Sequence, residues 1–168
     1  ANLDDYDVTY YEEYRAWQHL SNAKLLEGRF SGIATTPPHE FAIGTDIPAS
    51  RLTGAGWKVM TVSKNDLIND VNNITSDFIA NTFGEAPPNV MLWFGGKSSG
   101  SYDMEGVMTV MEAYALDKKV DDGIPSRGKW LGGPMLANCG DWPSEVYRLT
   151  IATAASERAC AMIVKTGL

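Results

Sequence analysis

Several features that mark common functional classes are missing from this chain of 168 residues. It has no stretch of about 18 apolar residues, the minimum for a membrane span, and no secretory signal peptide. It has no run of Lys and Arg, and its formal net charge is −7. Nucleic acids and anionic membranes both attract clustered cations. The composition therefore argues against either as a partner.

Residue types used in catalysis are also scarce. There are two histidines. His19 lies beside Trp17 and Leu20 in a predicted helix, which favours a structural role. His39 lies in a Pro-rich loop next to Glu40 and has no recognisable catalytic partner. No nucleophile elbow, P-loop, dinucleotide fingerprint or H-E-x-x-H motif occurs, and GGKSSGS lacks the P-loop spacing. The sequence predicts no enzyme and no cofactor.

The chain has two cysteines, Cys139 and Cys160. Zinc sites use closely spaced pairs of Cys or His, so this spacing argues against one. A disulfide is favoured over two free core thiols. It would close a loop of about 20 residues, contribute on the order of 3 kcal/mol, and place the protein outside the cytoplasm.

Length and apolar content predict one domain of 168 residues with its own core. There is no internal repeat. Periodicity predicts helices over Tyr10–Glu27, stopped by Gly28, and over Ser156–Thr166, with an ambiguous one over Asp66–Phe83. Strands are predicted over Trp57–Val62, over Asn89–Phe94 closed by Gly95 and Gly96, over Lys129–Leu131 and over Tyr147–Ala152. Turns are predicted over Lys97–Tyr102 and Asp103–Met108, and a long loop over Arg29–Thr53. Because strands and helices do not alternate, an antiparallel α+β domain with flanking helices is expected.

The segment Thr109–Lys129, TVMEAYALDKKVDDGIPSRGK, combines a helix start and a helix stop. Thr109 and Glu112 have the spacing of a capping box. One helical face is predicted to carry Ala113, Leu116 and Val120. Gly123 and Pro125 are typical of a helix end.

This segment carries more charge than a solvated helix needs: Asp117, Lys118, Lys119, Asp121 and Asp122. The helix dipole disfavours anions at a C-terminus, where Asp121 and Asp122 stand. The favoured interpretation is that the three acids pair with Lys118, Lys119 and Arg127, or cap the following turn. The alternative is a calcium site, although the EF-hand spacing is absent.

Three segments, in the same order, resemble a group of bacterial prepilin-type proteins. These proteins are type IV pilin-like and type II secretion pseudopilin-like subunits. The segments are YRAWQHLSNAKLLEGRFSG, which contains Trp17, Gln18, His19 and Leu20, then IPASRLTGAGW, and EAYALDKKVDDGIPSRGK. The stretch from Lys64 to Pro88 matches no known segment. YRLTIATAASERACAMIV is similar to type IVb pilin ends, where a strand leads into a Cys-containing helix.

The resemblance implies a pilin-like globular head and a structural role. Such proteins begin with a leader and a long apolar helix that anchors the subunit in the inner membrane and forms the filament spine. That helix is not in this sequence, which starts ANLDDYD. We expect a processed or engineered fragment, or a separate chain that supplies the helix. Membrane attachment would come through that helix alone.

The expected function is that of a structural subunit of an extracellular or periplasmic filament, either a type IV pilus or a pseudopilus, with other pilin-like subunits as partners. In this interpretation the charged residues of Thr109–Lys129 fix a helix–turn corner and contribute a subunit salt bridge. The alternative is a secreted or pilus-tip binding module that uses the 29–53 loop. An enzyme is the third hypothesis, supported by scattered carboxylates alone.

Overall fold

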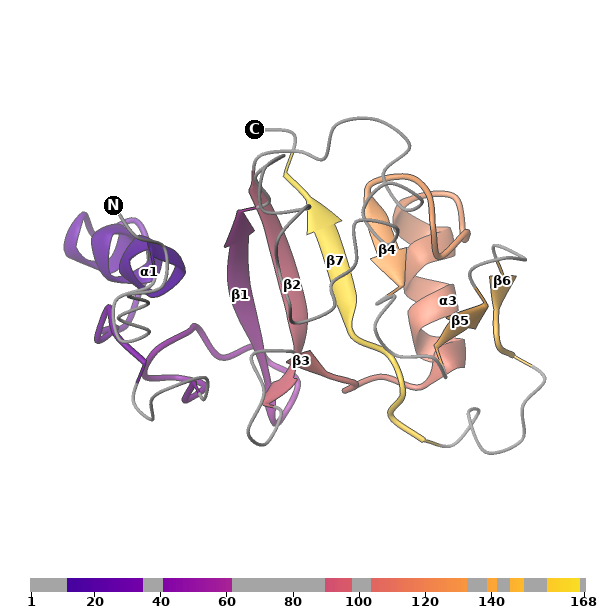
Figure 1. Ribbon diagram of the computed structural model, residues 1–168, viewed down its shortest axis with the longest axis horizontal. Helices are drawn as coiled ribbons and strands as arrows, with labels where there is room; N and C mark the ends of the chain where they lie inside the picture. Colours follow the sequence, from indigo (N-terminus) through magenta and orange to yellow (C-terminus); the bar gives the residue numbers. More distant parts are fainter. Residues whose placement is uncertain are drawn as a thin grey trace, which may run out of the picture.

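In the residues that the structure describes, an antiparallel sheet has a helix on each face. The computed structural model describes residues 12–34, 41–61, 90–97, 104–132, 139–141, 146–149 and 157–166. Helix α1 (Glu12–Asn22) and helix α3 (Val110–Val120) lie on opposite sides of the sheet (Figure 1). This arrangement confirms the expected antiparallel α+β class. Within the described residues, no helix has the length and apolar character needed to cross a membrane.

The main sheet has the order β1-β2-β7-β4, and β3 also pairs with β2. Its strands are β1 (Ala55–Thr61), β2 (Val90–Lys97), β3 (Met104–Glu105), β4 (Trp130–Gly132) and β7 (Met162–Lys165). All of these pairs are antiparallel. A separate two-stranded pair is formed by β5 (Gly140–Asp141) and β6 (Val146–Tyr147). The strands predicted around β1 and β4 are therefore confirmed within one or two residues of their ends.

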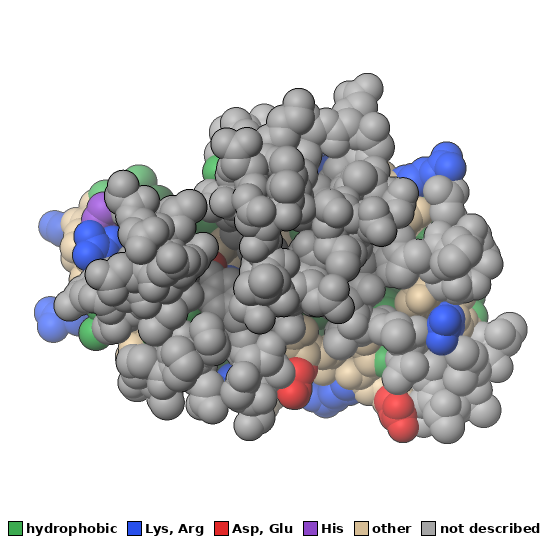
Figure 2. Space-filling view, viewed as in Figure 1, with side chains coloured by type: hydrophobic (Ala, Val, Ile, Leu, Met, Phe, Trp, Pro, Cys, Tyr) green, Lys and Arg blue, Asp and Glu red, His purple; other side chains and the backbone are tan. Residues whose placement is uncertain are grey.

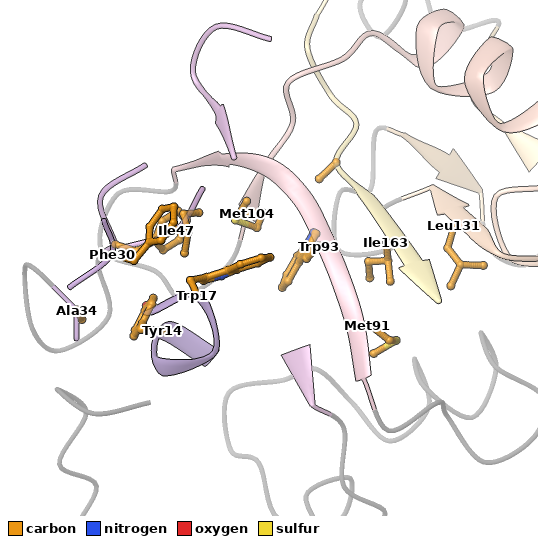
Figure 3. Packing of buried hydrophobic residues seen from close by; sticks show 12 residues of the cluster. Tyr14, Trp17, Phe30, Ala34, Ile47, Met91, Trp93, Met104, Leu131 and Ile163 are labelled. Carbon is orange, nitrogen blue, oxygen red and sulfur yellow. The ribbon is translucent and has the colours of Figure 1, made fainter. Parts of the chain in front are cut away.

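Each face of the sheet has its own apolar core, because neighbouring residues of a strand point to opposite sides. On the α1 side, Trp17 reaches toward Trp93 of β2 (Figure 3), and both are buried. On the α3 side, Phe94 and Met162 pack with Val110 and with both cysteines. The sheet is thus covered on both faces, which explains why β2 and β7 are apolar along most of their length.

Helix α1 is shorter than predicted and ends at a different residue. It stops at Asn22, and Lys24 takes a left-handed backbone conformation with φ 59°. The prediction that Gly28 ends the helix was wrong, because the chain must leave the helix early enough to bury Phe30. Tyr14 is buried, but Leu20 is 36% exposed. The predicted first residue, Tyr10, lies outside the described residues.

The described parts of the 29–53 loop are irregular, as predicted, but three of their large apolar residues belong to the core. Phe30, Phe41 and Ile47 are buried on the α1 side of the sheet. The buried Asp46 carboxylate accepts hydrogen bonds from the Ser31 hydroxyl (2.9 Å) and from the Ala42 N–H (2.8 Å). These bonds hold separate parts of the loop together. His39 and Glu40 lie outside the described residues.

Strand β2 continues through the two glycines that were predicted to close it. Gly95 and Gly96 pair with other strands, and Lys97, which was predicted to begin a turn, is the last residue of β2. A side chain at Gly95 would lie 2.7 Å from both the Glu105 carbonyl oxygen and Met104 Cβ. Glycine therefore allows the short strand β3 to approach closely, where the sequence predicted a turn.

The C-terminal predictions were largely wrong. Instead of the predicted helix over Ser156–Thr166, the described residues form β7, an inner strand of the sheet. A short apolar run is ambiguous between helix and strand, and here neighbours on both edges decide the outcome. The predicted strand Tyr147–Ala152 is confirmed only at Tyr147, in β6, because Arg148 and Leu149 are not in a strand. The predicted helix Asp66–Phe83 lies outside the described residues.

Candidate functional site

Helix α3 begins with the capping box expected from the sequence. The Thr109 hydroxyl oxygen accepts a hydrogen bond from the Glu112 N–H at 3.2 Å. In return the Glu112 carboxylate accepts bonds from the Thr109 N–H (2.9 Å) and hydroxyl (3.0 Å). These bonds, the backbone one first, lower the pKa of Glu112. The predicted helix start is confirmed.

The buried face of α3 differs from the predicted one. Val110, Ala113 and Asp117 are buried, whereas Val120 is 47% exposed. The prediction of a face through Ala113, Leu116 and Val120 was wrong for Val120. The reason is that a polar side chain, Asp117, takes the last buried position, where Tyr147 meets it.

Asp117 connects the end of α3 to strand β6. Its Oδ2 accepts a hydrogen bond from the Tyr147 hydroxyl at 2.8 Å, and its Oδ1 accepts one from the Gly123 N–H at 3.2 Å. Burial raises the pKa of the Asp117 carboxyl, and the two hydrogen bonds oppose that shift. Burial and the neighbouring Asp117 also raise the pKa of Tyr147. The contact therefore fixes two side chains from distant parts of the sequence.

Asp121 and Asp122 accept hydrogen bonds from the backbone that follows them. Asp121 Oδ2 accepts from the N–H groups of Lys129 and Trp130, the latter at 2.8 Å. Asp122 Oδ1 accepts from the Ile124 N–H at 2.8 Å. Their position at the negative end of the helix is therefore offset by local donors. The predicted capping of the turn is confirmed.

The glycines and the proline of this segment are required by close contacts. Gly123 and Gly128 both have positive φ, 78° and 75°. A side chain at Gly128 would collide with the Asp121 carboxylate. Pro125 is buried, and a side chain at Gly132 would lie 3.0 Å from its Cβ. We call the segment from Asp117 to Trp130 the α3 corner.

The cations of the α3 corner face outward. Lys118 and Lys119 are exposed, and Lys118 Nζ lies 5.6 Å from the centroid of the Tyr114 ring. That distance allows a cation–π contact within one helix turn. A salt bridge from these lysines to another subunit stays a prediction.

The three acids of the α3 corner also lie close enough to consider a metal ion. One carboxylate oxygen from each of Asp117, Asp121 and Asp122 falls within 4.8 Å of the others. Calcium takes six to eight oxygen ligands, and one oxygen from each of these carboxylates supplies three. Both oxygens of Asp117 already accept protein hydrogen bonds. The geometry is explained by the backbone and hydroxyl donors described above.

A disulfide joins Cys139 to Cys160, as favoured from the sequence, with the two Cα atoms 5.0 Å apart. Both cysteines are fully buried in the α3-side core. The carbonyl oxygen of Cys160 also accepts the N–H groups of Val107 (2.9 Å) and Met108 (3.2 Å). The disulfide therefore lies beside the chain that leads into α3.

The segment Trp17–Leu20 divides between core and surface. Trp17 is buried, and the Gln18 side-chain NH₂ donates to the Ser31 carbonyl oxygen at 2.9 Å. A side chain at Gly32 would lie within 3 Å of the Gln18 amide, so glycine is needed there. His19 and Leu20 are exposed. Trp17 and Gln18 thus contribute to packing at α1, whereas the structural role favoured for His19, whose side chain is exposed, stays a prediction.

Sequence reasoning missed a buried ion pair between α1 and β1. Lys58 Nζ lies 3.8 Å from Glu13 Oε2, and Lys58 is fully buried. The ammonium is also 5.7 Å from the centroid of the Phe41 ring. Burial raises the pKa of Glu13 to about 7, and the Lys58 charge opposes the shift. The one signal of this ion pair in the sequence was a lysine, Lys58, at an inward position of the predicted strand.

Comparisons with protein-family models, with curated proteins and with solved structures give no match for this chain.

Proposed function

We propose that this chain is the globular domain of a pilin-like or pseudopilin-like subunit and acts by packing against other subunits in an extracellular or periplasmic filament. The proposal rests on the three resembling sequence segments. It is compatible with the antiparallel α+β fold and with the disulfide, which suits an oxidising compartment.

One observation carries the proposal. Residues of the resembling segments help to attach α1 and α3 to the rest of the domain. Gln18 and Gly32 of the first segment fit together at α1. Asp117, Asp121 and Gly128 of the third segment hold the α3 corner. The resemblance therefore falls on positions that determine the domain's shape, as expected for a subunit whose function is packing.

The alternative of a binding module that uses the 29–53 loop has less support. In the described part of that loop, Phe30, Phe41 and Ile47 are directed into the core. Two other large apolar residues of the loop, Ile33 and Leu52, are partly exposed, each at 37%. The three core residues are therefore committed to holding the loop on the sheet.

Electron microscopy of material sheared from the cell surface tests the proposal. We expect filaments that contain this chain, identified by mass, and no such filaments from a strain that lacks its gene. A protein recovered solely as a soluble monomer, with no filament in the wild-type strain, would contradict the proposal.

A further inference from the structure

The end of α1 has an unusual backbone conformation. The Lys24 N–H donates to the Ser21 carbonyl oxygen and the Leu25 N–H donates to the Leu20 carbonyl oxygen, both at 3.0 Å. This pair of bonds is the Schellman pattern, in which glycine usually takes the left-handed position. Here that position is Lys24, the one non-glycine residue with positive φ among the described residues. A lysine there is strained, and strain in a backbone can indicate a functional position.

An apolar side chain projects into solvent next to this strained residue. Leu25 is 76% exposed, more than any other large hydrophobic residue in the described part of the chain. Leu20, one turn earlier and joined to Leu25 by the backbone bond, is also partly exposed. A contact between these two positions often accompanies the Schellman pattern. Even with such a contact, most of the Leu25 side chain is exposed to water.

The charge around Leu25 is opposite in sign to that of the whole chain. Lys24 and Arg29 are exposed, with Glu27 the exposed acid between them, and the whole chain has a net charge of −7. Basic, histidine and hydrophobic side chains are visible together over the α1 end of the molecule (Figure 2). A cationic corner with an apolar tip is complementary in charge to the acidic remainder of a second copy.

We propose that the corner formed by Leu20, Lys24 and Leu25 is a contact surface for a second copy of this chain. In this contact Leu25 is removed from water and Lys24 meets acidic side chains of the neighbour. The corner would bind a different surface of the next copy, and a contact of that kind builds open assemblies. The inference rests on the proposed function and specifies which surface of the subunit performs the packing.

Sedimentation velocity of the 168-residue chain over a range of concentrations, at low and high salt, tests this contact. We expect self-association that weakens as salt screens Lys24. Leu25→Ser should raise the dissociation constant at least about tenfold, as for a central apolar contact. Lys24→Ala should raise it about fivefold at low salt and by less at high salt.

Two further variants separate the contact from effects on folding. Lys24→Gly removes the cation and also the backbone strain, so it should raise the melting temperature and still weaken association as Lys24→Ala does. Leu52→Ser changes another exposed leucine and should leave association unchanged. A wild-type chain that stays monomeric would overturn the inference, as would unchanged association in Leu25→Ser. Binding of the corner to phosphatidylglycerol vesicles without self-association would also overturn it.

The Leu25→Ser variant also separates this inference from the proposed function. If surface filaments contain the subunit and Leu25→Ser neither lowers their yield nor weakens association, the corner is not the contact and the filament proposal stands. If no filament is found, the filament proposal fails. Sedimentation then still decides whether the corner binds a second copy.

Discussion

Helices α1 and α3 have the same length and cover opposite faces of one sheet, but they end in different ways. At the end of α3, carboxylates accept the N–H groups of the next turn, and glycines occupy the left-handed positions. At the end of α1, a lysine occupies the left-handed position and a leucine projects into water. One helix end is stabilised by local bonds, whereas the other keeps a strained residue and an exposed apolar side chain.

This difference indicates which part of the molecule is available for contacts. Most of the side-chain chemistry in the α3 corner is directed inward, at backbone and at Tyr147. The charges of the α3 corner would contribute to subunit contacts only if its outward-facing lysines form a salt bridge with another subunit. The features of the α1 end have no such internal use, so a partner is the simpler explanation for them.

Removing the carboxylate of Asp117 should have the largest effect on the α3 corner. Asp117→Ala leaves the buried Tyr147 hydroxyl and the Gly123 N–H without their acceptor, which should cost about 3 kcal/mol. Urea unfolding followed by circular dichroism measures this loss. Asp122→Ala, in the same corner but exposed, should cost about 1 kcal/mol or less. Equal losses in the two variants would show that the buried network does not hold the corner.

Removing the disulfide tests how much it stabilises the α3 side, where it lies beside the chain that leads into the helix. Replacing both Cys139 and Cys160 by alanine should lower the free energy of unfolding by about 3 kcal/mol, as expected for a loop of this length. Thermal unfolding should then show a melting temperature lower by about 6 to 12 °C. A change of less than about 2 °C would mean that packing alone fixes this part of the domain.

Burial of the Glu13 carboxyl makes the α1 side sensitive to pH. Glu13 has a pKa of about 7 in the folded chain against 4.5 ordinarily. Folding therefore favours its protonated form, and its contribution to stability is lost as pH rises through 7. Between pH 5 and pH 8 the wild-type chain should lose about 2 kcal/mol more than Glu13→Gln.

Chemical unfolding at several pH values measures this difference. Glu27→Gln, which changes an exposed residue, serves as the matched control. Its free energy of unfolding should change with pH as that of the wild-type chain does. Parallel slopes for the wild-type chain and Glu13→Gln would show that Glu13 does not titrate in this range.

The smallest expected effect is a gain in stability at the end of α1. Lys24→Gly should stabilise the domain by about 1 kcal/mol, because glycine has no penalty in the left-handed conformation. Lys24→Ala keeps the Cβ atom and should bring no such gain. Thermal unfolding of the two variants side by side separates them. If both variants have the melting temperature of the wild-type chain, Lys24 is not strained and the contrast between the two helix ends disappears.

Local signals in the sequence identified the parts of the fold that depend on near neighbours. The capping box at Thr109 and the glycine at Gly123 were predictable because their partners lie within a few residues. The alternating pattern of β1 was predictable for the same reason. In each case one short stretch of chain contains all the groups involved.

Contacts between distant residues could not be predicted in this way. The bond from Tyr147 to Asp117 spans 30 residues. The pairing of Glu13 with Lys58 joins residues even farther apart in the sequence. The early end of α1 depends on where Phe30 must pack, so the glycine nearest to the predicted end was misleading. A helix was predicted where β7 lies, because the pairing that makes this segment a strand comes from β2 and β4, which are distant in the sequence.

The position of β7 has a consequence for synthesis of the protein. It is the last strand in chain order among the described residues, but it lies between β2 and β4. The hydroxyl of Thr166, next to β7, donates to the Val90 carbonyl oxygen 76 residues earlier. A chain emerging from the ribosome therefore exposes an open edge of β2 until β7 has been made. Unpaired strand edges favour aggregation, so this domain has to complete its sheet in a single late step.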